Sequence, residues 1–172
     1  MTFRTTDLIG GLKINETSTA SSTGLQEFPL GTIIEAIDSV FGVGEFIFLK
    51  GVASTAVGDL VIYDTKAGTT VRTVAGSRGP CAIAMSANVA NQFGWYQISG
   101  QGVVKTAAAV VSGANGYVTA TAGATDDAVV ATDKIDGLRF KSADGTQTLH
   151  DGTTLASSAL VQLNRPSLNG NG

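Results

Sequence analysis

The sequence predicts an all-β fold, a compact β-barrel or β-sandwich of short antiparallel strands with an extended N-terminal arm. Three observations support this prediction. Short apolar or alternating runs recur at near-regular spacing from Phe46 onward, turn-forming residues separate them, and glycine far exceeds proline, with 22 residues against 3. Such spacing is typical of sandwiches and barrels. The runs are EFIFLKG, DLVIYD, TTVRTV, PCAIAMSA, GWYQISGQGVVKT, GYVTATAG, AVVAT, GLRFKSA, TQTLH and ALVQLN.

The turn signals between these runs are built around glycine. Asparagine or aspartate followed by glycine supplies the positive φ angles that tight hairpins need. We therefore expect turns at Lys66-Ala67-Gly68, Ala114-Asn115-Gly116, Asp136-Gly137, Asp144-Gly145 and Asp151-Gly152.

The chain of 172 residues and 17.5 kDa has the length of one domain. Residues 1–27 are rich in threonine and serine and lack a strand or helix period through TSTASSTG, so we expect an extended or flexible arm. Residues 28–165 then form a single β domain, and residues 166–172 form a tail. Over Thr32–Val40, β-branched residues favour extended structure, although the spacing of the isoleucines leaves a short helix open.

Two segments of the chain are similar to each other. GEFIFLKGVAST (Gly44–Thr55) aligns with GWYQISGQGVVKT (Gly94–Thr106) when one residue is inserted in the second segment, and an alanine-valine run follows each. We interpret them as two copies of a strand-turn-strand unit, as in a fold with pseudo-symmetric halves. The inserted residue predicts a β-bulge at Gly100-Gln101.

Composition and charge argue against several classes of partner. A net charge of −3 and a pI near 5.0 leave no electrostatic footprint for nucleic acid or an anionic membrane. The longest apolar stretch, VFGVGEFIFL, is interrupted by Glu45 and is shorter than the ~20 residues of a membrane helix. The N-terminus lacks the apolar core of a secretory signal and Cys81 is the single cysteine, so we expect assembly in a cytoplasm without disulfides.

The residues able to carry out catalysis are isolated from one another. His150 is the only histidine and ends a predicted strand, while no serine lies in a nucleophile elbow. Cys81 follows Gly-Pro in an apolar run, where a thiol behaves as a small buried hydrophobe. The glycine pairs at 42/44 and 100/102 lack the third glycine and the helix of a dinucleotide site.

Four carboxylates in ATDDAVVATDKIDG invite a calcium interpretation. They lack the order of an EF-hand loop and an apolar run divides them, so two solvated turns explain them better. These residues are Asp126, Asp127, Asp133 and Asp136. We therefore predict that the protein is not an enzyme and holds no cofactor or metal.

Trp95, the only tryptophan, is followed directly by Tyr96. On a strand neighbouring side chains point to opposite faces, so at most one of the two rings joins a given core. The other ring faces solvent, a second sheet or another chain, and large rings are enriched where proteins meet. A tryptophan that simply fills the core is the competing interpretation.

The order of these features resembles a known family. GVASTAVGDLVIYD is followed by CAIAMSANVANQFGWYQISGQGVVKT and then SGANGYVTATAG, with the matching small and apolar positions at Gly58, Val61 and Asp64, at 82–90, at Gly94, Ile98 and Gly102, and at 116–119. This pattern, over about residues 44–140, is similar to that of the head decoration, or capsid cement, proteins of tailed bacteriophages. The arm, the segment 28–40 and the residues after 141 lie outside it.

The resemblance implies a structural virion protein that binds the outside of an icosahedral head and clamps adjacent capsomers. It implies the major capsid protein as partner, self-association as a homotrimer, and a location on the capsid exterior. We expect the arm to contact the major capsid protein or a neighbouring trimer. The expected interface residues are Phe28, Leu30, Ile33, Phe46, Phe48, Trp95 and Tyr96. The alternative function is a carbohydrate-binding or adhesin-like β-module of a phage tail, a fibre or a cell surface, with Trp95, Tyr96, Tyr63 or Tyr117 as a stacking platform.

Overall fold

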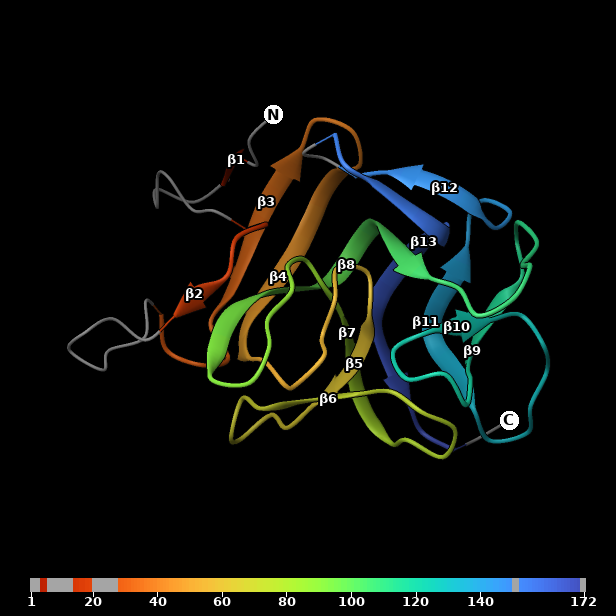
Figure 1. The fold of residues 1–172 in the computed structure, drawn as a ribbon, viewed down its shortest axis with the longest axis horizontal. Coiled ribbons are helices and arrows are strands. Elements are labelled where there is room, and N and C mark those ends of the chain that lie inside the picture. Colours follow the sequence, from red (N-terminus) through yellow and green to blue (C-terminus); the bar gives the residue numbers. More distant parts are fainter. Residues whose placement is uncertain (1–3, 6–13, 20–27, 150–151, 171–172) are drawn as a thin grey trace.

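The computed structural model describes residues 4–5, 14–19, 28–149 and 152–170, and confirms the all-β prediction (Figure 1). No helix long and apolar enough to cross a membrane occurs in these ranges. The strands are β1 (Arg4–Thr5), β2 (Ser18–Thr19), β3 (Ile33–Asp38), β4 (Gly42–Lys50), β5 (Leu60–Tyr63), β6 (Thr70–Arg72), β7 (Gly79–Ala84), β8 (Gln92–Lys105), β9 (Asn115–Val118), β10 (Thr125–Asp126), β11 (Lys134–Phe140), β12 (Gly145–Thr148) and β13 (Thr154–Leu168).

The strands form an open antiparallel sheet that branches at β8. One edge of β8 pairs with β4, while its other edge pairs first with β7 at residues 96–97 and then with β13 at residues 99–105. The main path runs β1-β3-β4-β8-β7-β13-β11-β9-β10, with β2, β5, β6 and β12 attached beside it. The branching folds the sheet into a sandwich-like body and leaves it unclosed, so β3 and β9 lie toward opposite ends of the molecule (Figure 1).

Three clusters of buried apolar side chains lie on the faces of this sheet. The largest gathers residues of β5, β7, β8, β9, β11 and β13 around Phe140. A second surrounds Trp95 and includes Phe46 and Phe48, and a third surrounds Tyr96. Because β4 and β8 alternate between the second and third clusters, they hold both clusters together.

The two similar segments do not fold as equivalent units. Gly44–Lys50 lies in β4 and pairs antiparallel with β8, but residues 51–59 form a loop, whereas the second segment stays in one strand through Lys105. A register shift does occur, opposite the step from Glu45 to Phe46, where Ile98 is the extra residue. The bulge therefore lies at Ile98 and not at Gly100-Gln101. Ile98 is the point at which the other edge of β8 changes its pairing from β7 to β13.

Segment 32–40 contains the extended strand β3, so the helix interpretation is wrong. Its burial alternates, with Ile34, Ala36 and Asp38 inside and the intervening side chains outside, the period-two pattern of a half-buried strand. The expected C-terminal tail also requires correction, because β13 continues through Leu168 and the side chain of Leu168 is buried.

Three other predictions are wrong. Asp136-Gly137 does not form a hairpin turn, because it lies inside β11 at a shift in the register with β13. AVVAT (residues 128–132) is not a strand, since it forms a loop between β10 and β11. Asn115-Gly116 begins β9 instead of forming a turn, and the turn lies earlier, at Gly113 with φ 86°. Strand pairing explains the outcome for AVVAT and for Asn115-Gly116. β9 pairs with β11, whereas AVVAT pairs with no strand of the described sheet.

The described parts of the predicted arm lie against the domain. β1 pairs with β3 at Ala36 and Ile37, and β2 pairs with β8 at Gln92 and Phe93. Between them, Ile14 is fully buried in the cluster around Trp95. The residues between these contacts, 6–13 and 20–27, lie outside the described ranges.

Candidate functional site

The structure places Trp95 and Tyr96 on opposite faces of β8, as strand geometry predicts, but both rings are buried. Of the surroundings left open for the second ring, the structure shows a separate buried cluster, and neither ring faces solvent. Phe46 and Phe48 are buried as well. All four side chains therefore pack inside the chain and leave no surface for contact with another protein. The cluster around Trp95 includes Ile14 of the N-terminal segment, and the cluster around Tyr96 includes residues of β5 and β7.

The rings of the Trp95 cluster pack at distances typical of aromatic pairs. Ring centroids lie 5.2 Å apart for Phe48 and Trp95, 5.4 Å for Phe28 and Trp95, and 5.5 Å for Phe28 and Phe48. Phe28 and Leu30 are half-buried at the rim of this cluster. Within the domain they act as a cover for Trp95, which leaves only their outer edges for contact with another chain.

Ile33 is the one predicted interface residue that is exposed, and it belongs to a group of exposed apolar side chains that the sequence pattern did not delimit. We call the residues Ile33, Ile37, Val40 and Val43 the first patch. They lie on the outer side of the β3–β4 hairpin, with Ile37 paired directly to Val43, and each is between 43% and 56% exposed. The alternation in IIEAID was the signal that could have grouped Ile33 with Ile37.

An ion pair crosses from β4 to β13 beside this patch. Arg165 donates from Nε and Nη2 to the two carboxylate oxygens of Glu45, at 3.1 and 2.9 Å. Hydrogen bonding from Arg165 is the main reason that the pKa of Glu45 is lowered, and the same contact raises the pKa of the guanidinium. Glu35 lies opposite Glu45 in the strand register, so two carboxylates lie among the apolar side chains of the first patch, and Arg165 neutralises one of them.

Replacing Arg165 with glutamine is expected to reduce stability near neutral pH and to have little effect in acid. Because the pKa of Glu45 is lowered in the folded chain, the ion pair with Arg165 contributes its full stabilisation at pH values above the ordinary pKa of a glutamate. That stabilisation is lost as the pH falls through the lowered pKa. Urea unfolding at about pH 7 and about pH 2 measures the difference. Lys66→Gln, which removes the same charge from an exposed turn, is the control, and an Arg165→Gln effect that persists unchanged at the lower pH contradicts the assignment.

A second ionic cluster is buried and joins four segments. Asp59, whose side chain is fully buried, accepts a hydrogen bond from Arg72 Nε at 2.8 Å and lies 2.9 Å from Lys105 Nζ. It also accepts a hydrogen bond from the backbone N–H of Ala56 at 2.9 Å, and Arg72 donates onward to the carbonyl of Ala122 at 2.7 Å. Every partner of Asp59 and Arg72 in this cluster belongs to a neighbouring strand or loop of the same domain. The cluster therefore stabilises the fold.

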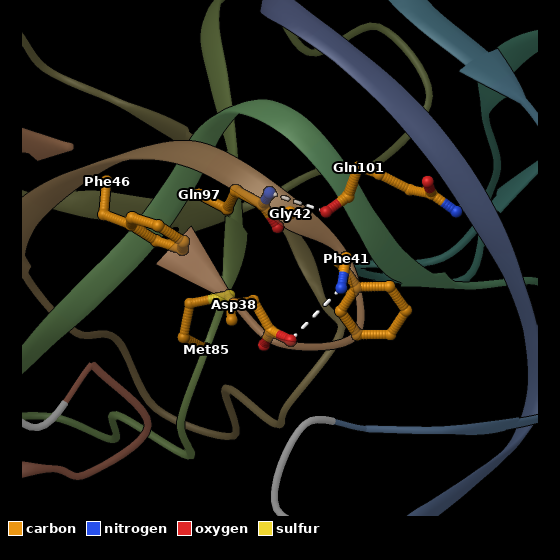
Figure 2. A pocket seen from close by; sticks show the side chains of 7 residues that line it. All are labelled: Asp38, Phe41, Gly42, Phe46, Met85, Gln97 and Gln101. Carbon is orange, nitrogen blue, oxygen red and sulfur yellow. Dashed lines mark hydrogen bonds between the residues drawn. The ribbon is translucent and has the colours of Figure 1, made fainter. Parts of the chain in front are cut away.

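Figure 2 shows a small cavity between the β3–β4 turn and β8. Its volume is about 10 Å³, room for about one water molecule. Gln97 Nε2 donates to the carbonyl of Gln101 at 2.9 Å, and the N–H of Phe41 donates to Asp38 Oδ1 at 3.1 Å, so its walls are held by the chain (Figure 2). The other lining residues are Gly42, Phe46 and Met85.

Two larger depressions lie on the surface. One of about 260 Å³ is lined by Asn115, Gly137, Leu138, Arg139, Gln162 and Asn164. The other, of about 340 Å³, is lined by Ile62, Tyr63, Asp64, Thr69, Val71 and Arg78. Trp95, Tyr96 and Tyr117 are buried, so Tyr63 is the one ring of the four proposed stacking platforms that reaches a depression of this size.

The residues considered for catalysis and metal binding are separated in space or held by local contacts. Cys81 is buried, which raises the pKa of its thiol to about 12, as a structural cysteine requires. Asp127 accepts from the N–H of Val111, and Asp133 accepts from the N–H of Gly76. Among the described residues, no three acidic, cysteine or histidine side chains gather into a possible metal site. His150 lies outside the described residues.

Comparisons of this chain with protein-family models, with curated proteins and with solved structures found no match.

Proposed function

We propose that the protein is a structural component of a bacteriophage virion, one that binds the outer surface of the head and stabilises the capsid by clamping adjacent capsomers. The observation that carries the proposal is the first patch, four exposed apolar side chains on the β3–β4 hairpin at one end of an all-β domain. Exposed apolar groups gathered on one face favour contact with another protein. The sequence pattern of residues 44–140 supplies the class of partner, the major capsid protein and further copies of the chain.

The arm supports the same function. β1 pairs with β3 at Ile37, so the described part of the arm borders the first patch. An extended segment beside an apolar face can continue onto a neighbouring subunit and add contacts there. In this proposal the protein acts mechanically, without a catalytic residue, cofactor or metal.

Deleting residues 1–13 is expected to weaken binding to expanded empty capsids of the same virus by about tenfold. This deletion removes β1 and retains Ile14, whereas deletion of residues 1–27 would also take Ile14 out of the core and confound binding with folding. Cosedimentation of capsids with the purified chain measures occupancy, and circular dichroism checks the fold. Full-length chain that fails to bind the capsids contradicts the function, and unchanged occupancy after deletion excludes the arm from it.

One observation favours carbohydrate binding as the second candidate. Tyr63 is half-buried and lines the 340 Å³ depression together with Asp64, Thr69 and Arg78, which combines a ring face with polar groups. A glycan array with the purified chain separates the two functions, since a capsid protein without a sugar site gives no specific signal there.

A further inference from the structure

A polar hollow lies on the exposed face of β9, β11 and β13, away from the first patch. Its volume is about 260 Å³, and it is lined by Asn115, Gly137, Leu138, Arg139, Gln162 and Asn164. The opposite face of the same strands is buried in the cluster around Phe140. Figure 1 shows β9 and β11 at the right of the molecule, with β3 and β4 toward the left. A ligand in the polar hollow therefore leaves the first patch free.

The polar side chains of this face form a row across four strands. Arg139 of β11 lies opposite Asn115 of β9 on one side and opposite Gln162 of β13 on the other. Gln162 in turn lies opposite Gln101 of β8. Side chains directly opposite each other share a face, with Cβ atoms about 4.5–5.5 Å apart. The row therefore sets side-chain amides on both sides of one guanidinium.

The hollow opens at Gly137, where the row of side chains has a gap. Gly137 has a φ of 79°, and the register with β13 shifts between Asp136 and Leu138. A Cβ atom at position 137 would come within 2.5 Å of the carbonyl oxygen of Asn164. The bulge thus requires a residue without a side chain, and the space that a side chain would fill stays open.

Arg139 is the one charged residue that lines the hollow. Its Nε donates to the carbonyl of Gly113 at 2.8 Å, which orients the guanidinium and uses one of its five donors. The one acidic residue of β11, Asp136, lies 3.3 Å from Lys134 Nζ and does not line the hollow. In a chain of net charge −3, the hollow is therefore complementary to one negative charge.

We propose that the polar hollow binds an acidic sugar, with the carboxylate of a uronic acid on Arg139 and its hydroxyl groups on Asn115, Gln162 and Asn164. The planar guanidinium matches a carboxylate in a bidentate contact. Side-chain amides donate and accept, as the hydroxyl groups of a sugar require. One cation suits a carboxylate better than a phosphate group, which carries nearly two charges. The volume lies just below the range for drug-sized ligands and suits a single sugar ring.

An acidic segment of a partner protein would bring the same carboxylate, but the hollow favours the sugar. The centre of a protein interface is apolar, whereas the four exposed side chains that line the hollow are all polar. Leu138, the one apolar side chain of the lining, is buried. The inference does not rest on the capsid function, because neither the first patch nor the arm takes part in it.

The test is a titration of the purified, isotope-labelled full chain followed by nuclear magnetic resonance. The probes are methyl glucuronide, methyl glucoside, which lacks the charge, and N-acetylaspartate amide, which has a carboxylate and no hydroxyl groups. Arg139→Gln removes the charge, and Gln162→Ala is an independent variant that leaves the bond from Arg139 to Gly113 in place. Arg78→Gln, in the depression beside Tyr63, is the matched control. Circular dichroism confirms that each variant is folded.

We expect methyl glucuronide to bind with a Kd of about 1 mM and to shift the backbone resonances of β9, β11 and β13. Arg139→Gln is expected to weaken binding about tenfold, Gln162→Ala about threefold, and Arg78→Gln not at all. No binding of methyl glucuronide, equally tight binding of either other probe, or wild-type binding by the two hollow variants overturns the inference. Loss of binding in Arg78→Gln alone places the sugar beside Tyr63 and overturns it as well. Capsid cosedimentation is a separate measurement that none of these outcomes changes.

Discussion

Replacing Asp59 with asparagine is expected to lower the free energy of unfolding by about 3 kcal/mol. The carboxylate is fully buried and balances Arg72 at 2.8 Å and Lys105 at 2.9 Å, and these two cations are only about a quarter exposed. Asparagine keeps the shape and can still accept from the N–H of Ala56, but it leaves two positive charges side by side. Removing one partner of a buried ionic cluster leaves an uncompensated buried charge. The loss of folding free energy is then larger than the net stabilisation that the intact cluster provides.

Urea unfolding followed by circular dichroism measures this loss. Asp64→Asn is the control, because Asp64 is exposed and its carboxylate caps the turn at Lys66 and Ala67. A triple variant in which leucine replaces Asp59 and methionine replaces both Arg72 and Lys105 is expected to recover most of the stability, since apolar groups of similar volume often substitute for a buried ionic cluster. An Asp59→Asn chain as stable as wild type contradicts the assignment of this cluster as a structural centre.

Replacing Trp95 with alanine is expected to lower the free energy of unfolding by about 3–5 kcal/mol. The ring packs against Phe48 at 5.2 Å and Phe28 at 5.4 Å, and Ile14 of the N-terminal segment is buried in the same cluster. The substitution leaves a cavity between the sheet and the segment that covers it, so we also expect the N-terminal residues to be cleaved faster by protease.

Thermal and urea unfolding followed by far-ultraviolet circular dichroism measure the stability of this variant without the tryptophan signal. Trp95→Phe is expected to lose less, because a smaller ring keeps part of the contact, and Val71→Ala on exposed β6 is expected to change little. If Trp95→Ala retained wild-type stability, the ring would not be the centre of the cluster. Capsid binding by folded Trp95→Phe tests the separate point that this ring acts through the fold and not through direct contact.

Local pattern was sufficient for most strands. The apolar runs of β4, β5, β7, β8 and β13 were recognised because alternation and β-branched residues depend on neighbours in sequence. The runs that failed show the limit: AVVAT has the composition of a strand and finds no partner, while Asn115-Gly116 has the composition of a turn and is drawn into β9 by pairing with β11. A strand forms only where another strand pairs with it, and the local sequence pattern does not show which strand that is.

The candidate site was only partly predictable. Ile33 was among the expected interface residues and is exposed, whereas Phe46, Phe48, Trp95 and Tyr96 were expected at an interface and lie in the core. Large rings are enriched both in cores and at interfaces, so residue type alone could not separate the two. Val129 and Val130 were not expected at the surface, because AVVAT was assigned to a strand and instead forms a loop.

The sequence by itself determined that the chain is all-β, that Cys81 is a structural thiol, and that Trp95 and Tyr96 point to opposite faces of one strand. These properties follow from side-chain period, composition and local chemistry. The tertiary structure alone decided that both rings are buried and that the apolar side chains of the first patch stay exposed. Burial depends on what covers each face, and that depends on the branching at β8 and on the position of Ile14, which bring together residues far apart in the chain.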